Sequence, residues 1–272
     1  MWFFGQNYYK PGPGVDVDEP RKKGILRFFE ICSRDFFELI KLNVFFFICC
    51  VPSAVLFVFF VLGLGGAASM LFFLLSLAAA FPVGGAISAA FFCVTKMLRD
   101  DPGFIWHDFK RKFKENLFVS MPAGIICALV FYTQVYILVM FAESRGASAE
   151  PWMAVLDIIA LVVFGMVMPY VFAQAPYLYL KQAGLLKNSL ILAFINAPRS
   201  FMGAVQGGAI WALYAFFFPV SILFSPLLAI IGFTLSWLLA LMWVWKPVDG
   251  QFRIEETFLK RRQEALDVQP TE

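Results

Sequence analysis

One stretch decides the fold of this chain: KLNVFFFICCVPSAVLFVFFVLGLGGAASMLFFLLSLAAAFPVGGAISAAFFCVTK, residues Lys41–Lys96. The 54 residues between its two lysines carry no charge. A transmembrane α-helix needs about 20 predominantly apolar residues to cross roughly 30 Å of hydrocarbon. The stretch is therefore long enough for two crossings joined by a short turn. Pro82 interrupts the second crossing, which predicts a kink or a break there.

The rest of the chain continues this pattern. It is 61% hydrophobic and 15% charged, whereas soluble domains are about 45–50% apolar and about 25% charged. Three more charge-free runs have room for one, one and two crossings: Glu115–Glu143, Asp157–Lys181 and Arg199–Lys246. We therefore predict an all-α, polytopic transmembrane bundle of about six spans. The expected spans are Leu42–Leu64, Ala67–Thr95, Phe118–Phe141, Trp152–Leu178, Phe201–Ser221 and Leu223–Trp245.

The distribution of basic residues predicts the orientation. Of the 22 Lys and Arg residues, seven precede the first span, six follow the second, three follow the fourth and five follow the sixth; only Arg145 falls in an outer connection. Lys and Arg favour the cytoplasmic side of short loops. We expect a multi-pass protein of the cell membrane with both termini in the cytoplasm. The chain then divides into a leader with an amphipathic helix (1–41), the spans (42–245) and a tail (246–272).

The segment before the first span has two parts. Met1–Lys23 contains three prolines and mixed charge, and lacks the apolar core of a signal peptide. Ile25–Lys41 alternates apolar and charged positions at three- and four-residue spacing, which predicts an amphipathic helix that runs into the first span. Its apolar positions include Ile25, Phe28, Phe29, Cys32 and Phe36, and its charged positions include Arg27, Glu30, Arg34 and Glu38.

The sequence offers little for catalysis or cofactor binding. His107 is the only histidine, which excludes a zinc site built from histidines. The five cysteines form no CxxC pair and are expected to pack as small hydrophobic residues. There is no phosphate-binding glycine loop, and no Ser or Cys has a plausible base. The net charge of +3 does not suggest a nucleic-acid partner. We predict no enzymatic activity, no catalytic or metal-binding residues and no cofactor.

Polar and small residues within the spans can be interpreted as structural or as functional. Asp157 is a candidate intramembrane carboxylate, and such groups are often functional. It lies only five residues after Trp152, however, so it is expected near the outer interface, where a structural role is favoured. Gln134, Gln174 and Gln206 are expected to join helices by hydrogen bonds. Small-residue faces favour close helix contact, and they include Gly84, Gly85, Gly203 and Gly207.

The most specific local feature is the cytoplasmic connection Thr95–Asn116, TKMLRDDPGFIWHDFKRKFKEN. Aromatic and apolar residues recur at four-residue spacing among closely spaced basic residues. This pattern is typical of an interfacial helix that faces anionic lipid headgroups. It also suits a docking surface for a cytoplasmic partner, and the two readings are compatible. The candidate contact residues are Ile105, Trp106, Phe109, Lys110, Arg111, Lys112, Phe113 and Lys114.

Pro82–Asn116 resembles the signature of the YesL-like family of bacterial integral membrane proteins, a domain of unknown function. Lys41–Pro52 looks like that family's first span, in which Leu-Asn leads into an aromatic-rich run that ends at proline. Many members carry Gly-Pro-Ala where this chain has Gly84–Ala86. The resemblance implies no known molecular activity. It implies association with carbohydrate uptake, because members are often encoded beside sugar uptake and degradation systems in Gram-positive bacteria.

The chain can also be compared with permease subunits of ABC transporters, which likewise have about six spans. Lys181–Pro198 superficially resembles their ATPase-docking loop, but Gln182–Gly184 lacks the acidic residue, and Asn188 stands where glycine is expected. We interpret Leu185–Ile195 as a second interfacial helix instead. Two functions remain. The chain is expected to be an accessory or regulatory component of a carbohydrate-uptake system, with sugar ABC transporter subunits as possible partners. The alternative is a transporter or channel subunit in its own right.

Overall fold

The computed structural model describes residues 23–62, 67–101, 103–143, 151–178, 180–217 and 220–267, and all regular structure within them is helical. Most of the predicted leader, the outer loop with Arg145 and the last five residues lie outside this part of the chain. The helices follow in the order α1 (Ile25–Arg34), α2 (Phe36–Val61), α3 (Ala67–Ala79), α4 (Phe81–Arg99), α5 (Ile105–Glu143), α6 (Pro151–Gln174), α7 (Gln182–Ile195), α8 (Ala197–Phe216), η1 (Val220–Phe224), α9 (Ser225–Leu227), η2 (Leu228–Gly232), α10 (Phe233–Phe252) and α11 (Ile254–Asp267).

The prediction of an all-α polytopic bundle is confirmed. Five helical segments of the described chain are long and apolar enough to cross a membrane: Phe36–Val61, Ser69–Arg99, Ile105–Ile137, Val155–Gln174 and Val220–Phe252. The remaining expected span corresponds to α8, which packs between α6 and α10. Its 20 residues could extend about 30 Å, but its glycines and polar residues make it less apolar than the other five. The count of six crossings therefore stays a prediction.

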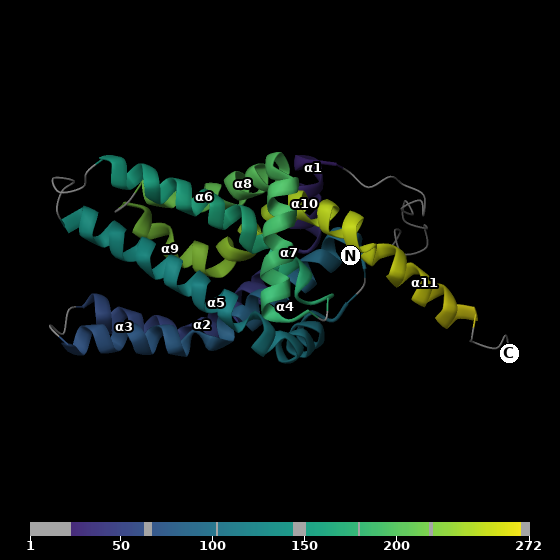
Figure 1. Ribbon diagram of the computed structural model, residues 1–272, viewed down its shortest axis with the longest axis horizontal. Coiled ribbons are helices and arrows are strands. Elements are labelled where there is room, and N and C mark those ends of the chain that lie inside the picture. Colours follow the sequence, from purple (N-terminus) through teal and green to yellow (C-terminus); the bar gives the residue numbers. More distant parts are fainter. Residues whose placement is uncertain are drawn as a thin grey trace, which may run out of the picture.

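Most of these segments run along the long axis of the bundle, and α7 runs across it (Figure 1). α1 and α11 lie toward the same end, on the right of the view. The second predicted span is broken where expected. α3 ends at Ala79, α4 begins at Phe81, and Pro82 occupies the first turn of α4, where a missing backbone N–H costs nothing.

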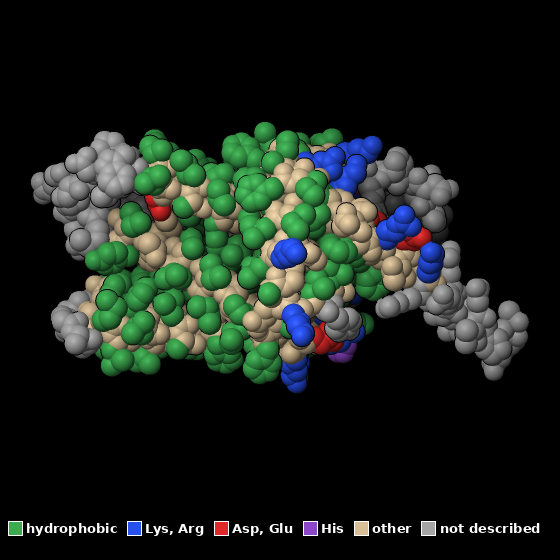
Figure 2. All heavy atoms as spheres, viewed as in Figure 1, with side chains coloured by type: hydrophobic (Ala, Val, Ile, Leu, Met, Phe, Trp, Pro, Cys, Tyr) green, Lys and Arg blue, Asp and Glu red, His purple; other side chains and the backbone are tan. Residues whose placement is uncertain are grey.

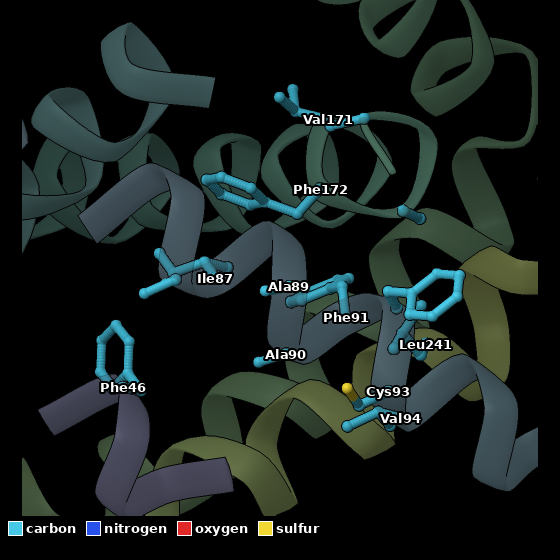
Figure 3. Packing of buried hydrophobic residues seen from close by; sticks show 14 of the residues in the cluster. Phe46, Ile87, Ala89, Ala90, Phe91, Cys93, Val94, Val171, Phe172 and Leu241 are labelled. Atoms are coloured by element: carbon cyan, nitrogen blue, oxygen red, sulfur yellow. The ribbon is translucent and has the colours of Figure 1, made fainter. Parts of the chain in front are cut away.

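α4 is the central helix. Its residues from Val83 to Thr95 are all buried, as expected for a helix that is apolar on every side. Phe91 lies within 5.8 Å of the Phe172 ring centroid and within 5.9 Å of that of Trp237. Figure 3 shows α4 side chains packed among Phe46 of α2, Phe172 of α6 and Leu241 of α10. The middle of α4 is therefore packed against α2, α6 and α10.

The predicted small-residue faces do bring helices together. A Cβ on Gly84 would lie 1.9 Å from the Ser120 carbonyl oxygen of α5, and one on Gly124 would lie 2.1 Å from the Gly84 nitrogen. Similarly, a Cβ on Gly207 would lie 3.1 Å from the Ser236 carbonyl oxygen of α10. Only glycine permits such close backbone approach.

Asn43 forms hydrogen bonds with backbone groups at an irregular turn of the last expected span. The π-helical turn η2 leaves backbone groups without their usual α-helical partners. The buried Asn43 side chain donates to the Ala229 carbonyl and accepts from the Thr234 N–H, at 3.1 Å. Backbone polar groups inside a bilayer must find partners within the protein. This role was not foreseen from the sequence.

Candidate functional site at the charged end of α4

The charged end of the bundle is organised around the last turn of α4. Asp100 follows this helix in the left-handed conformation, with φ 58°, and its N–H bonds to the Met97 carbonyl at 3.3 Å. Asp101 donates its N–H to the Lys96 carbonyl at 3.0 Å. A left-handed residue commonly ends a helix, and Asp tolerates that conformation better than most. The turn directs the Asp100 carboxylate toward α1, whereas the Asp101 carboxylate pairs with Arg99 of α4 itself.

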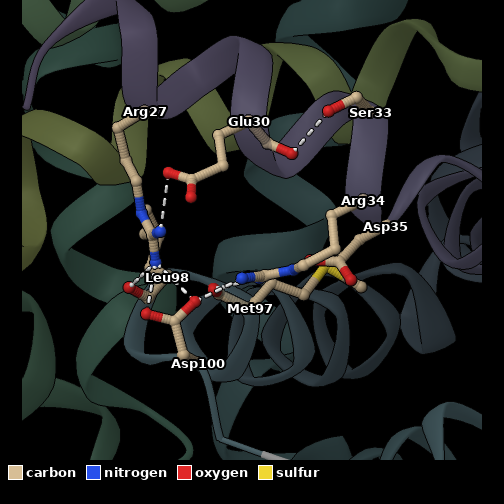
Figure 4. A network of polar contacts seen from close by, with 8 residues as sticks. All are labelled: Arg27, Glu30, Ser33, Arg34, Asp35, Met97, Leu98 and Asp100. Carbon is tan, nitrogen blue, oxygen red and sulfur yellow. Dashed lines mark hydrogen bonds and ion pairs between the residues drawn. The ribbon is translucent and has the colours of Figure 1, made fainter. Parts of the chain in front are cut away.

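Two arginines of α1 bind this helix end (Figure 4). Arg27 Nη2 lies 2.7 Å from both carboxylate oxygens of Asp100 and 2.9 Å from the Leu98 carbonyl, and its Nη1 lies 3.0 Å from Glu30. Arg34 pairs with the same Asp100 carboxylate and donates to the Met97 carbonyl at 3.0 Å. Cations are favourable at a helix C-terminus, where carbonyls lack intrahelical partners. The α1 helix therefore caps α4.

The amphipathic segment before the first span differs from the prediction in two ways. The helix is not continuous to Lys41, because it ends at Arg34 and α2 starts at Phe36 after a bend at Asp35. Arg27, expected on a polar outer face, is 6% exposed and points into the protein. Its partner Asp100 is 73 residues away in sequence, so helical spacing alone could not indicate this arrangement.

Arg27 and Arg34 also control the ionisation of Asp100. Burial acts to raise the pKa of Asp100, but the hydrogen bonds and positive charges of the two arginines outweigh burial and hold the pKa below its usual value. The carboxylate is therefore charged throughout the physiological range. A buried guanidinium is tolerated when it is paired and hydrogen-bonded in this way.

A second ion pair joins the end of α4 to the start of α5. Lys96 Nζ lies 2.7 Å from Asp108 Oδ2, and Arg111 Nη2 lies 3.1 Å from Asp108 Oδ1. The Asp108 side chain is 8% exposed. Gly103 makes room for this pair, since a Cβ there would lie 2.4 Å from Lys96 Nζ. The Lys96–Asp108 pair fixes the direction in which α5 leaves the loop.

Arg99 lies in an aromatic environment at the same end. Its guanidinium carbon is 4.9 Å from the ring centroid of Phe258 in α11, 5.7 Å from Trp245 in α10 and 5.8 Å from Tyr177. Asp101 pairs with it at 2.6 Å. Cation–π contacts of this kind contribute about 0.5–2 kcal/mol each, depending on desolvation. They tie the C-terminal helix to α4, which sequence reasoning did not foresee.

The predicted docking residues divide into internal and exposed groups. The interfacial helix expected in the connection Thr95–Asn116 is not a separate element but the beginning of the continuous helix α5. Phe109 is buried against Phe45, at 5.5 Å between ring centroids, and Phe113 is partly buried. Ile105 also packs on the core. These apolar candidates thus hold α5 to the bundle.

The basic candidates divide in the same way. Lys112 is engaged within the protein, 2.7 Å from Glu115 and 3.1 Å from the Pro176 carbonyl, and Arg111 bonds to Asp108. Lys110 and Lys114 are exposed, and among the described residues no carboxylate lies within ion-pair distance of either. Trp106 is 59% exposed, and Lys110 Nζ lies 6.0 Å from its ring centroid.

Asp157 is placed by a helix-to-helix hydrogen bond. Its Oδ1 accepts from Gln134 Nε2 of α5 at 2.8 Å. The other two glutamines also join helices, as predicted: Gln174 donates to Ser189 of α7, and Gln206 accepts from Trp243 of α10. This geometry supports the structural reading of these residues.

Other reactive side chains are isolated. His107 is 71% exposed, with Nδ1 3.9 Å from Asp108. The cysteines are free thiols that lie in or against the core, and burial raises the pKa of Cys32 to about 11, which disfavours a nucleophilic thiolate. Within the described residues no group of three or more His, Cys, Asp or Glu side chains is placed to hold a metal ion.

The molecular surface is divided into an apolar part and a charged part. On the face drawn in Figure 2, apolar side chains cover the left and central parts, and Lys and Arg gather toward the right, at the charged end. A shallow hollow is lined by Phe118, Val119, Lys181, Gln182 and Ala183. Gln182 closes it by donating to the Phe118 carbonyl at 2.8 Å.

No protein-family model, curated protein or solved structure matches the chain.

Proposed function

We propose that this chain is an accessory or regulatory membrane subunit without catalytic activity, and that it docks onto a carbohydrate-uptake system through the start of α5. The observation that carries the proposal is the pair of exposed lysines, Lys110 and Lys114, next to the exposed Trp106. Exposed basic and aromatic side chains together suit an acidic partner surface, since charge complementarity guides association and Trp is a frequent anchor of interfaces.

The partner class comes from the resemblance of Pro82–Asn116 to the YesL-like family. Carbohydrate-uptake systems of the ABC class are the partners which that resemblance implies, in the cell membrane of a Gram-positive bacterium. With both termini cytoplasmic, the charged end of the bundle would face the side on which such a system binds its ATPase. The α5 lysines would then be accessible to its subunits.

The packing of the spans argues against the alternative, a transporter or channel. Coupled transport generally needs charged groups that converge in the membrane interior. In the described spans Asp157 pairs with Gln134, Gln174 and Gln206 join neighbouring helices, and the centre around α4 is filled with apolar side chains. Polar side chains in these positions hold helices together.

Lysine substitution tests the docking proposal. The variant Lys110→Gln/Lys114→Gln should reduce co-purification of transporter subunits in mild detergent by about 2- to 30-fold, because exposed ion pairs contribute about 0.2–1 kcal/mol each. The charge-preserving variant Lys110→Arg/Lys114→Arg should retain the partner. Lys112→Gln is the matched control, since Lys112 is engaged within the protein; it should lower thermal stability and leave co-purification nearly unchanged.

Two outcomes would contradict the proposal. One is equal recovery of the partner with Lys110→Gln/Lys114→Gln and with the native chain. The other is flux of a sugar or an ion through the purified protein in liposomes that Asp157→Asn abolishes. An asparagine at position 157 still offers an oxygen to Gln134, so we expect Asp157→Asn to leave sugar-dependent growth nearly intact.

A further inference from the structure

α1 is an amphipathic helix that turns its charged side toward the protein. Arg27 is buried and bonds to the end of α4. On the other side, Ile25, Leu26 and Phe29 are 60–65% exposed. An amphipathic helix packed on a water-soluble surface buries its apolar side. Other apolar residues of α1, Phe28, Ile31 and Cys32, do pack on the core. The three outward residues face away from the protein, beside no apolar partner helix of the described chain, so they require an apolar environment outside the protein.

α7 shows the same outward apolar face. It packs on the bundle through Leu185 and Leu192, which are buried. Its other side presents Leu190, Ile191, Phe194 and Ile195, which are 45–73% exposed. The helix has 14 residues, about 21 Å at 1.5 Å per residue, and it runs across the long axis of the bundle (Figure 1). It is too short to cross a bilayer and lies in the wrong direction to do so.

The outward face of α1 continues into the surface of the first span. Phe36 and Phe37, directly after the bend, are exposed, and so is Ile48 further along α2. Because α2 is long and apolar enough to cross the membrane, its exposed side chains face lipid. Lys187 of α7 is exposed three and four residues before Leu190 and Ile191, where a lysine can extend to phosphate headgroups while its methylenes stay in the apolar layer.

The geometry points to the lipid bilayer as the partner of these two faces. We define the apolar collar as the exposed residues Ile25, Leu26, Phe29, Leu190, Ile191, Phe194 and Ile195. The collar is immersed in the acyl-chain boundary of the leaflet at the charged end of the bundle, so α1 and α7 are interfacial anchors. Immersion of α1 also explains why Arg27 points into the protein while Ile25, Leu26 and Phe29 point away from it. With lipid outside, the best partners for Arg27 and Arg34 are the carboxylate and carbonyls at the end of α4.

Spin labels on the full-length chain test this inference. The native cysteines are replaced by alanine, a single cysteine is introduced at Phe29 or Phe194, and a nitroxide is attached. The protein is reconstituted in vesicles of phosphatidylcholine and phosphatidylglycerol at a 3:1 ratio. Collision with oxygen, which partitions into lipid, is compared with collision with a water-soluble nickel chelate. Ile48 is the lipid-facing reference, and Leu259, an equally apolar and 59% exposed side chain of α11, is the matched reference at the charged end.

Labels at Phe29 and Phe194 should collide with oxygen more often than with the nickel chelate, as at Ile48, and the label at Leu259 should show the reverse. Labels at Leu26 and Ile191 repeat the test, so that a single badly folded variant does not decide it. Collision with the chelate at all four collar positions, at the level found for Leu259, would overturn the inference. This result is independent of partner docking, because the α5 lysines are unchanged in every sample.

Discussion

Substitution of Asp100 by asparagine tests the capping of α4 by α1. Asparagine tolerates the left-handed conformation of this position, so the variant removes the negative charge without adding backbone strain. The Arg27 side chain, 8% exposed, then loses its main counter-charge. Breaking a buried pair costs about 3–5 kcal/mol, and the amide oxygen of asparagine retains one acceptor. We therefore expect α1 to be less firmly docked by about 2–3 kcal/mol.

Hydrogen exchange measured by mass spectrometry reads this change directly. If α1 opens by detaching from α4, its amides should exchange about 30- to 160-fold faster in Asp100→Asn, because each 1.4 kcal/mol is a factor of about ten. Peptides from the centre of α4 should be unaffected. The matched control is Glu38→Gln, which removes a carboxylate from the exposed pair with Lys41 and should cost under about 0.5 kcal/mol. Equal exchange of α1 in the two variants would refute the capping argument.

The pH dependence of this contact has a definite sign. The pKa of Asp100 is lower in the folded protein than in the unfolded chain, so its stabilisation is complete above the unfolded value of about 3.9. It is lost as the pH falls through the lower, folded value. The difference in α1 protection between the native chain and Asp100→Asn should be constant from about pH 5 to pH 8 and shrink below about pH 4.

Two further predictions concern packing and topology. Gly84→Ala should lower the stability of the detergent-solubilised protein by more than about 2 kcal/mol, because its methyl group would meet the Ser120 carbonyl of α5, whereas Gly208→Ala, with open space around it, should cost nothing in thermal unfolding. For topology, a cysteine at Ser148 should react with an impermeant thiol reagent in intact cells and one at Ser33 should not, and the opposite labelling pattern would invert the predicted orientation.

The features predicted correctly from the sequence depend on local patterns. Charge-free length predicts a crossing because the bilayer thickness is fixed, and the break before α4 follows from the geometry of Pro82. Glycine at four-residue spacing marks close contact because no side chain can occupy that space. The glutamines join helices because an unpaired amide is costly in an apolar layer. None of these arguments requires knowledge of a distant partner.

The interfacial helix expected before the third span does not end before that span, and the reason is local. The dense charge of Lys110–Glu115 favours an interfacial location, but charge alone does not end a helix. Lys and Glu are good helix formers, and no Pro or Gly lies between Gly103 and Pro122. With no residue to interrupt it, one helix continues from Ile105 into the apolar segment.

Helical spacing and the fold together decide which charges near the end of α4 are free. The pairs of Arg111 with Asp108 and of Lys112 with Glu115 lie three residues apart and follow helical spacing. The pair of Lys96 with Asp108 and the bond of Lys112 to the Pro176 carbonyl depend on the fold. The connection Thr95–Asn116 carries six basic and four acidic residues, and its Lys96, Arg99, Arg111 and Lys112 are all engaged within the protein. Their partners come from α5, from the loop after α4 and from the segment after α6. Of the four basic candidate contacts, only Lys110 and Lys114 have no carboxylate within ion-pair distance among the described residues. A variant that neutralises all four would disturb packing and docking together, so only the smaller substitution can separate these two effects.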